Sequence, residues 1–317
     1  AYPTIGSLIS KEKGDPESSL PRFVSIAPYR FFNPAAFAPG ILGPMHAPLI
    51  VGDTLGFGNP GGRTDYTDAL KVKDLEAPPH PEGVVDSRVS LLRDLEKDFA
   101  TARPDTPGKS HQAAYERAVK LMKSSARKAF NLDEEKAAVR DAYGRNLFGQ
   151  GCLLARRLVE RGVPFVEVNY GGINNNAFGW DTHGNNNAAC KELCGPLDTG
   201  WAMLMKDLKE RGLLDSTLIV WMGEFGRTPK LNGGNGRDHY PNAWSAVLAG
   251  GGVRGGQAYG DTGKDGVEVT KNPVNVPDFL ATIMKAMGIN PEGENMSGAR
   301  PIKFVDRGFK PIQAILD

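Results

Sequence analysis

The stretch TLIVWM at residues 217–222, followed directly by GEFGRTP at residues 223–229, decides the fold prediction for this chain. A short, continuous apolar run is typical of a strand that is buried on both faces of a parallel sheet. Further strands are predicted at 163–170 and 244–249. A helix is predicted between the strands 163–170 and 217–222, whose starts lie about 50 residues apart. Their connection is therefore predicted to be a right-handed parallel crossover. The sequence therefore predicts an α/β fold with a largely parallel sheet flanked by helices.

Apolar residues recur at helical spacing in several other segments. The pattern predicts helices at 85–99, 111–130, 131–144, 145–161 and 188–211, and from Pro277 to about 288. We interpret residues 85–161 as a helical layer or insertion, and residues 163–290 as the core that carries the functional site. The prediction is a single α/β domain over residues 1–317.

Composition excludes several classes of protein. The 317 residues are enough for a sizeable core, and 38 Lys+Arg against 37 Asp+Glu leave a net charge of +1, which creates no global field for nucleic acid or an anionic membrane. No apolar run reaches the roughly 18 residues of a membrane span. Three cysteines are too few for a disulfide framework. Cys190 and Cys194 share a helix face, either as small core residues or in a redox or metal role. Oligomeric state is left open.

Carboxylates and histidines gather beside glycines in WDTHG at 180–184, in GEFGRTP and in GRDHYP at 236–241. Each segment adjoins a predicted strand, and open α/β sheets bind ligands at the carboxyl edge of their strands. One such pair alone is usually an ordinary hydrogen-bonded pair, but three together indicate a divalent-metal site, with Zn²⁺ or Mn²⁺ as the preferred ion. The predicted ligands are Asp181, His183, Glu224 and His239, with Asp238 as a further ligand or an orienting group.

Two arginines flank these acidic residues. Arg227 and Arg237 either bind the non-bridging oxygens of a phosphate or sulfate or compensate the charges of Glu224 and Asp238. The asparagines at 174–176 and 185–187 either form turns or line a polar pocket. The residues leave both pairs of alternatives open.

Several segments together resemble a known family. They are YG at 143–144, FGQGCLLARRLVE at 148–160, WDTH at 180–183, GEFGRTP at 223–229 and GRDH at 236–239. This combination is similar to the family of unknown function called DUF1501. The resemblance covers essentially the whole chain, and GEFGRTP is its most specific motif.

The resemblance implies an alkaline phosphatase/sulfatase-like fold and a two-metal centre acting on small anionic esters or on sulfated or phosphorylated glycans. In that superfamily a strand ends in Asp-His-Gly, and here Glu224-Phe225-Gly226 stands in its place. The carboxylate is kept, whereas phenylalanine replaces a histidine ligand. Asp181 and His183 resemble the pair that holds the other ion, at a shorter spacing than is usual, and His239 resembles its third ligand.

The resemblance also bears on location and activity. DUF1501 proteins usually begin with an export signal, which implies a periplasmic or extracellular protein. The early metal carboxylate and the nucleophile are expected upstream of Ala1, so we expect an N-terminally incomplete chain with little or no hydrolase activity of its own. The predicted function is a metal-dependent, hydrolase-like protein for phosphate or sulfate esters. The alternative, favoured by Phe225, is a non-catalytic binding or cell-envelope protein that the metal stabilises.

Overall fold

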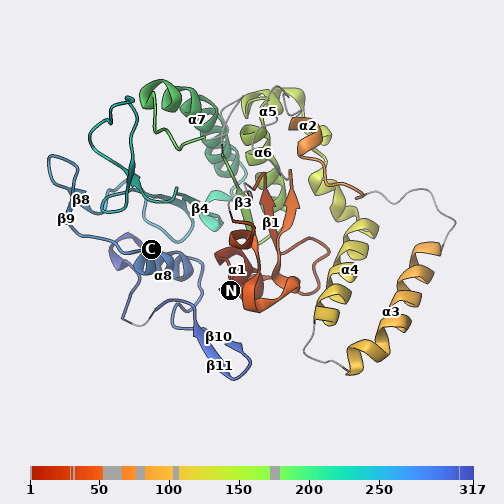
Figure 1. The fold of residues 1–317 in the computed structure, drawn as a ribbon. Coiled ribbons are helices and arrows are strands. Elements are labelled where there is room, and N and C mark those ends of the chain that lie inside the picture. Colours follow the sequence, from red (N-terminus) through yellow and green to blue (C-terminus); the bar gives the residue numbers. More distant parts are fainter. Residues whose placement is uncertain are drawn as a thin grey trace. The chain divides into compact units, whose positions relative to one another are not determined.

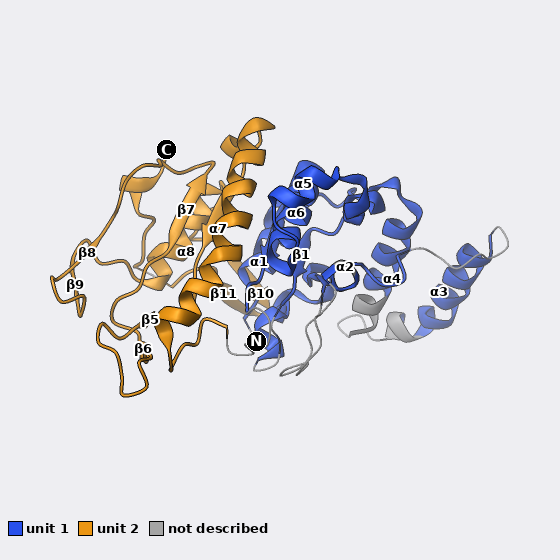
Figure 2. Ribbon diagram, turned by 90° about the horizontal axis from the view of Figure 1, so that it is seen from above, with its two compact units in different colours: residues 1–175 blue, residues 176–317 orange. Residues whose placement is uncertain are grey.

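A computed structural model describes residues 2–28, 30, 33–52, 66–75, 83–102, 107–171, 179–306 and 308–317. The chain divides into two compact units, residues 1–175 and residues 176–317. Figure 1 labels the helices and strands of both, and Figure 2 colours the two units separately.

A three-stranded parallel sheet forms the centre of unit 1. Its order is β2 (Leu49–Val51), β1 (Phe23–Ile26), β3 (Phe165–Val168), and β1 pairs with both neighbours in parallel. The strand predicted at 163–170 is confirmed as β3, and the α/β class is confirmed by parallel strands combined with helices. All four residues of β1 are buried, as expected for a central strand.

Helices α1 (Ile5–Lys13) and α6 (Leu147–Glu160) pack on opposite faces of this sheet. A Cβ placed on Gly6 of α1 would lie 2.6 Å from the ring of Phe23, and one on Gly151 of α6 would lie 3.2 Å from Val168. Alternate strand residues point to opposite faces, so one set meets α1 and the other meets α6. The two glycines allow the helices to approach the strands closely.

The helical layer predicted at 85–161 is present in unit 1, with different boundaries. Its elements are α3 (Val84–Ala102), α4 (Pro107–Lys123), the 3₁₀ turns Ser125–Phe130 and Leu132–Glu134, α5 (Ala137–Ala142) and α6. The helix expected at 111–130 stops at residue 123, because the Ser124 side chain accepts a hydrogen bond from the Ala126 amide and caps a new 3₁₀ turn. Asn131 caps another short turn, so the expected helix 131–144 is reduced to α5.

Unit 1 also contains α2 (Tyr66–Ala69) and the 3₁₀ turns Pro34–Phe37, Gly40–Leu42 and Pro44–His46. Two arginines of α6 are buried: the side chains of Arg156 and Arg157 are 1% and 3% exposed. Glu135 pairs with both, at 2.9 Å and 2.5 Å. Glu160 adds a second carboxylate to Arg156, and Glu134 adds one to Arg157. The loop before α5 is thus tied to α6 by charge.

Unit 2 is built around one long helix and several short strand pairs. The helices are α7 (Asn186–Glu210) and α8 (Val276–Ala286), with 3₁₀ turns at Leu214–Ser216 and Gln313–Ile315. The strands are β4 (Leu218–Trp221), β5 (Gly226–Arg227), β6 (His239–Tyr240), β7 (Val247–Gly250), β8 (Asp261–Thr262), β9 (Val269–Lys271), β10 (Glu294–Ser297) and β11 (Arg300–Lys303). They pair as β4–β7, β5–β6, β8–β9 and β10–β11.

The expected parallel arrangement is wrong for the strands of unit 2. Strand β4 pairs with β7 in antiparallel fashion, with Leu218 opposite Gly250 and Trp221 opposite Val247. A parallel pair needs a long crossover connection, usually a helix, whereas residues 222–246 contain only the short hairpin of β5 and β6. The strand predicted at 217–222 is present as β4, but its predicted burial on both faces is wrong: Leu218, Ile219 and Val220 are half-buried and Trp221 is exposed. An apolar run also does not encode the direction of the neighbouring strand.

The three cysteines have different environments. Cys152 is buried in α6, and burial raises the pKa of its thiol to about 12. Cys190 is half-buried and Cys194 is exposed on α7, so the interpretation of both as core residues is wrong for Cys194. Among the described helices, none combines the length and apolar character that crossing a membrane requires.

Candidate metal centre

Two backbone segments of unit 2 place the side chains of the candidate metal centre. Asp181 and His183 lie just before α7, and His239 begins β6, which pairs with β5 through Arg227 opposite His239. An isolated bridge between Gly184 and Asn235 joins the two segments. Residues distant in sequence are therefore held at one place by backbone hydrogen bonds within unit 2.

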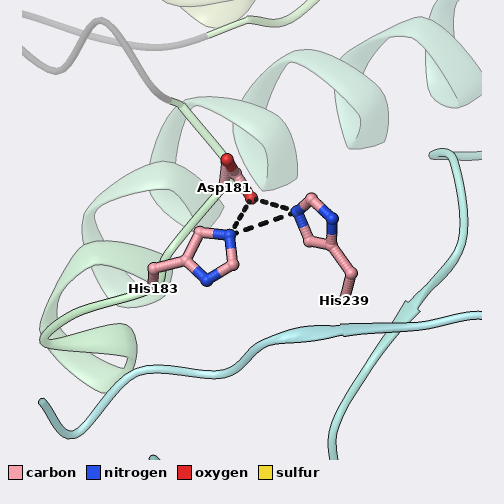
Figure 3. A group of neighbouring side chains, drawn as sticks. All are labelled: Asp181, His183 and His239. Carbon is pink, nitrogen blue, oxygen red and sulfur yellow. Dashed lines mark hydrogen bonds and ion pairs between the residues drawn. The ribbon is translucent and has the colours of Figure 1, made fainter.

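Three ligand atoms converge at this place (Figure 3). Asp181 Oδ1 lies 2.9 Å from His239 Nε2 and 3.1 Å from His183 Nε2. The two Nε2 atoms are 3.2 Å apart. All three side chains are partly open to solvent, with exposed fractions of 38% for Asp181 and 46% for each histidine.

The triangle of ligand atoms fits one face of a metal coordination shell. Bonds of about 2.0–2.2 Å to nitrogen and oxygen place neighbouring ligand atoms about 2.8–3.1 Å apart in an octahedral shell and about 3.3–3.6 Å apart in a tetrahedral one. The observed edges of 2.9, 3.1 and 3.2 Å are close to the octahedral values. A cation at the centre would also explain why the two imidazole Nε2 atoms lie so close together, because both lone pairs could then point at the ion. The residues therefore fit a divalent ion.

Asp238 orients His183 from the far side of its ring. Its Oδ1 lies 3.0 Å from His183 Nδ1 and accepts a 2.9 Å hydrogen bond from Asn232 Nδ2. These two hydrogen bonds hold the pKa of Asp238 below its ordinary value of 3.8. An ionised carboxylate only accepts, so Nδ1 donates its proton to Asp238, and the other ring nitrogen, Nε2, faces the centre. Asp238 is therefore placed where an orienting group would be, and it is not one of the three residues whose ligand atoms converge.

Asn232 holds the loop between β5 and β6 in place, and the sequence analysis missed it. Its Nδ2 also donates to the carbonyl of His183 at 3.0 Å, and its Oδ1 accepts from the amides of Gly234 and Gly236, both at 2.9 Å. One side chain thus joins both segments of the centre. The Asn-Gly-Gly sequence at 232–234 is a turn signal that marks the loop without revealing this role.

Glu224 lies outside the converging group. Its Oε1 forms an ion pair with Arg227 Nη2 at 3.1 Å. The same nitrogen also lies 3.1 Å from Asp181 Oδ1. The guanidinium is therefore the cation shared by the two carboxylates. Burial raises the pKa of Asp181, but the hydrogen bond from His239 and the charges of His183 and Arg227 outweigh it and bring that pKa below 3.8.

Arg237 and Phe225 complete the surroundings. Arg237 Nη1 donates to the carbonyls of Thr228 and Pro229 at 2.6 and 2.7 Å, which fixes the GRTP segment rather than compensating an acidic side chain. The ring of Phe225 packs against that of His239 with centroids 4.5 Å apart. Both guanidinium groups are engaged within the protein, and an aromatic wall supports one ligand histidine.

One of the two asparagine clusters, residues 185–187, lies within the part of the chain that the structure describes. Asn174–176 lie outside the described residues. Asn186 is buried at the start of α7, where its Oδ1 accepts from the Thr182 hydroxyl at 2.7 Å. Asn185 and Asn186 also donate their backbone amides to the carbonyls of Gly234 and Asn235. This cluster therefore ties the Asp-x-His segment to the glycine-rich loop.

A matched pair of glycine substitutions tests this packing. A Cβ on Gly236 would lie 1.9 Å from the carbonyl carbon and oxygen of His183, whereas one on Gly233 meets nothing within 4 Å. We expect Gly236→Ala to weaken Zn²⁺ binding by at least about tenfold, comparable to loss of an outer-shell partner. Gly233→Ala should leave it unchanged. Zinc titration against a chromophoric chelator measures both, and equal affinities for the two variants would contradict the described contact.

The fold and the site define a mixed α/β protein with a candidate two-histidine, one-carboxylate metal centre. The model of the family described as "Protein of unknown function (DUF1501)" matches residues 1–316, and the chain belongs to this family. No curated protein and no solved structure was found to match the chain. The family suggested by the motifs is thereby confirmed.

Proposed function

We propose that this chain is a divalent-metal-dependent, hydrolase-like protein that acts on phosphate or sulfate esters. The observation that carries the proposal is the convergence of Asp181, His183 and His239, whose ligand atoms lie within 4.8 Å of one another. Three protein ligands on an exposed surface leave coordination positions open, which is the pattern of catalytic rather than structural zinc sites. A bound Zn²⁺ or Mn²⁺ would supply Lewis-acid chemistry, polarising an ester oxygen and acidifying a water molecule.

The chain's own residues have distinct roles in this proposal. Asp181, His183 and His239 hold the ion, and Asp238 keeps the proton of His183 on Nδ1 so that Nε2 faces it. Arg227 adds positive charge 3.1 Å from Asp181, beside the place where an anionic ester would bind. Arg237 holds the GRTP backbone that carries Arg227. Both arginines thereby serve anion binding, one by its charge and one by positioning.

We propose one ion per chain rather than two. A second ion would need Glu224 as a ligand, but Glu224 and Asp181 already share the guanidinium of Arg227. Phe225 supplies no ligand atom to replace the histidine of an Asp-His-Gly motif. A fixed arginine charge between two carboxylates takes the electrostatic place of a second cation.

The substrate class and location rest on the resemblance to the alkaline phosphatase/sulfatase-like superfamily. A hard oxyanion is a suitable ligand for a Zn²⁺ or Mn²⁺ ion with open positions. Small anionic esters and sulfated or phosphorylated glycans therefore belong to the proposal, as does a periplasmic or extracellular location. The partner is a small molecule or glycan rather than nucleic acid.

The alternative function is a non-catalytic, metal-stabilised binding or cell-envelope protein. It is favoured by the packing of Phe225 against His239 and by the engagement of Arg227 with two carboxylates. In this case the ion would connect the segment before α7 to β6. Metal removal would then lower the stability of unit 2 without any effect on ester chemistry.

Calorimetric titration with phosphate, sulfate and their aryl esters separates the two functions. Binding needs the ion alone, whereas turnover also needs a nucleophile, so the two are measured separately. We expect oxyanions to bind the Zn²⁺- or Mn²⁺-loaded protein at least about tenfold more tightly than the metal-free protein, because the open positions accept an oxygen ligand. In the metal-loaded protein, Arg227→Lys should bind the oxyanions more weakly than the wild type. Cys194→Ser, at an exposed position, is the control and should bind them as the wild type does. A loaded protein that binds none of these anions would refute the ester proposal and support the alternative.

A further inference from the structure

Helix α3 has two different lateral faces. One face packs against α4, where Asp86 pairs with Lys123 and Arg93 pairs with Glu116, the latter at 3.1 Å. Figure 1 shows the two helices side by side within unit 1. The residues of α3 on this side that are half-buried include Val85, Val89, Leu92 and Glu96. Their spacing of three and four residues forms a continuous seam along α4.

A second stripe runs beside this seam and is exposed. It consists of Arg88, Leu91, Leu95 and Asp98, again spaced three, four and three residues apart. Leu91 is 59% exposed and Leu95 is 72% exposed. Single exposed leucines need no explanation, but two in one stripe with coiled-coil spacing form a potential helix-pairing surface. We call these four residues the α3 stripe.

The α3 stripe is complementary to itself in one orientation only. If a second α3 runs antiparallel, with the two-fold axis level with residue 93, Arg88 of each copy meets Asp98 of the other. In the same arrangement Leu91 of each copy meets Leu95 of the other. A parallel pair would instead place arginine against arginine and aspartate against aspartate. Charge therefore selects the antiparallel arrangement, as charges flanking a seam do in coiled coils.

The charges at the ends of the stripe are available for such pairing. Neither Arg88 nor Asp98 forms an ion pair with any residue that the structure describes, and both are exposed. By contrast, Arg93 and Asp86 on the same helix are already paired with α4. A two-fold contact would provide Arg88 and Asp98 with two equivalent ion pairs and cover four leucine side chains.

We propose that the α3 stripe docks a second copy of this chain as an antiparallel, two-fold symmetric helix pair. The contact is isologous, so it closes as a dimer and does not propagate into a filament. The residues of the α3 stripe all belong to unit 1, whereas the candidate metal centre belongs to unit 2.

Sedimentation of the whole chain over a concentration series tests the proposal by charge reversal. The wild-type chain is expected to dimerise. Arg88→Asp places four carboxylates in one interface, and Asp98→Arg places four guanidinium groups there, so each variant should raise the dimer dissociation constant at least about tenfold. The double variant carries both changes and should regain wild-type affinity.

Mixing the two single variants gives the sharpest result. Each Arg88→Asp chain then meets an Asp98→Arg chain with opposite charges at both ends of the stripe, so a mixed dimer forms although neither variant dimerises well alone. Circular dichroism checks that both variants remain folded, as expected for exposed positions. A wild-type chain that stays monomeric over the series would overturn the proposal. So would single variants with wild-type affinity, or a mixture with no gain in dimer.

Discussion

Replacing His239 with alanine is expected to weaken Zn²⁺ binding by more than about 100-fold, above the range for loss of an outer-shell partner. The substitution removes one of the three ligand atoms that converge in unit 2, so only Asp181 and His183 remain to bind the ion. Asp238→Asn should have a smaller effect, about 10- to 100-fold, because it only loosens the orientation of His183. Competition with a chromophoric chelator measures all three proteins.

The control for this series is another histidine. His46 lies in unit 1, where its Nδ1 is 3.2 Å from the Ser10 hydroxyl. It is remote in sequence from both segments of the metal centre. His46→Ala should leave zinc affinity unchanged. If His239→Ala and His46→Ala had equal effects, zinc would be bound through scattered surface histidines and the described centre would not be its site.

Replacing Glu135 with alanine is expected to cause the largest loss of stability in unit 1. Arg156 and Arg157 are buried, and both use Glu135 as a partner. Breaking a buried ion pair from one side costs about 3–5 kcal/mol, and the remaining partners Glu134 and Glu160 favour the lower end. A loss of about 3 kcal/mol lowers the thermal midpoint of a unit of this size by roughly 6–12 °C.

Glu134→Ala is the matched control for Glu135→Ala. The Glu134 side chain is 36% exposed and pairs with Arg157, which keeps Glu135 as a second partner, so the loss of Glu134 should cost no more than about 1 kcal/mol. Thermal unfolding followed by circular dichroism compares the two variants. Similar midpoints would show that Glu135 does not hold the two arginines.

The same cluster predicts a pH dependence. Burial raises the pKa of Glu135, but hydrogen bonds from Arg156 and Arg157 outweigh it and bring the pKa below its ordinary value of 4.5. A depressed carboxyl pKa contributes stability above the unfolded value, and that contribution is lost as pH falls through the folded value. The stability difference between the wild type and Glu135→Gln should therefore shrink as the pH falls below 4.5.

The sequence predicted the elements of the fold better than their arrangement. Periodic apolar residues located α3 and α6, because burial of one helix face leaves a direct pattern in the sequence, and the segment 163–170 was correctly predicted as a strand, β3. The pattern does not encode strand direction, so the antiparallel pairing of β4 with β7 was not foreseen. Short polar caps at Ser124 and Asn131 divided two expected helices, since local side-chain hydrogen bonds compete with helix continuation.

The candidate site was predicted in its central part. Asp181, His183 and His239 stand in short motifs of uncommon composition, and the structure brings their ligand atoms together. The role of Arg227 as the shared partner of Asp181 and Glu224 depends on distances that no spacing rule gives. Asn232 lay beyond sequence reasoning for the same reason, because its four hydrogen bonds arise only after the loop closes.

The zinc content of the whole chain after complete chelation and reloading, measured by elemental analysis, tests the metal centre directly. We expect one tightly bound Zn²⁺ per wild-type chain, and none in a variant with Asp181, His183 and His239 all replaced by alanine. X-ray absorption at the zinc edge should then show two imidazole ligands with oxygen ligands. A wild-type chain that retains no zinc, or a triple variant that binds it equally well, would show that Asp181, His183 and His239 do not form a zinc site.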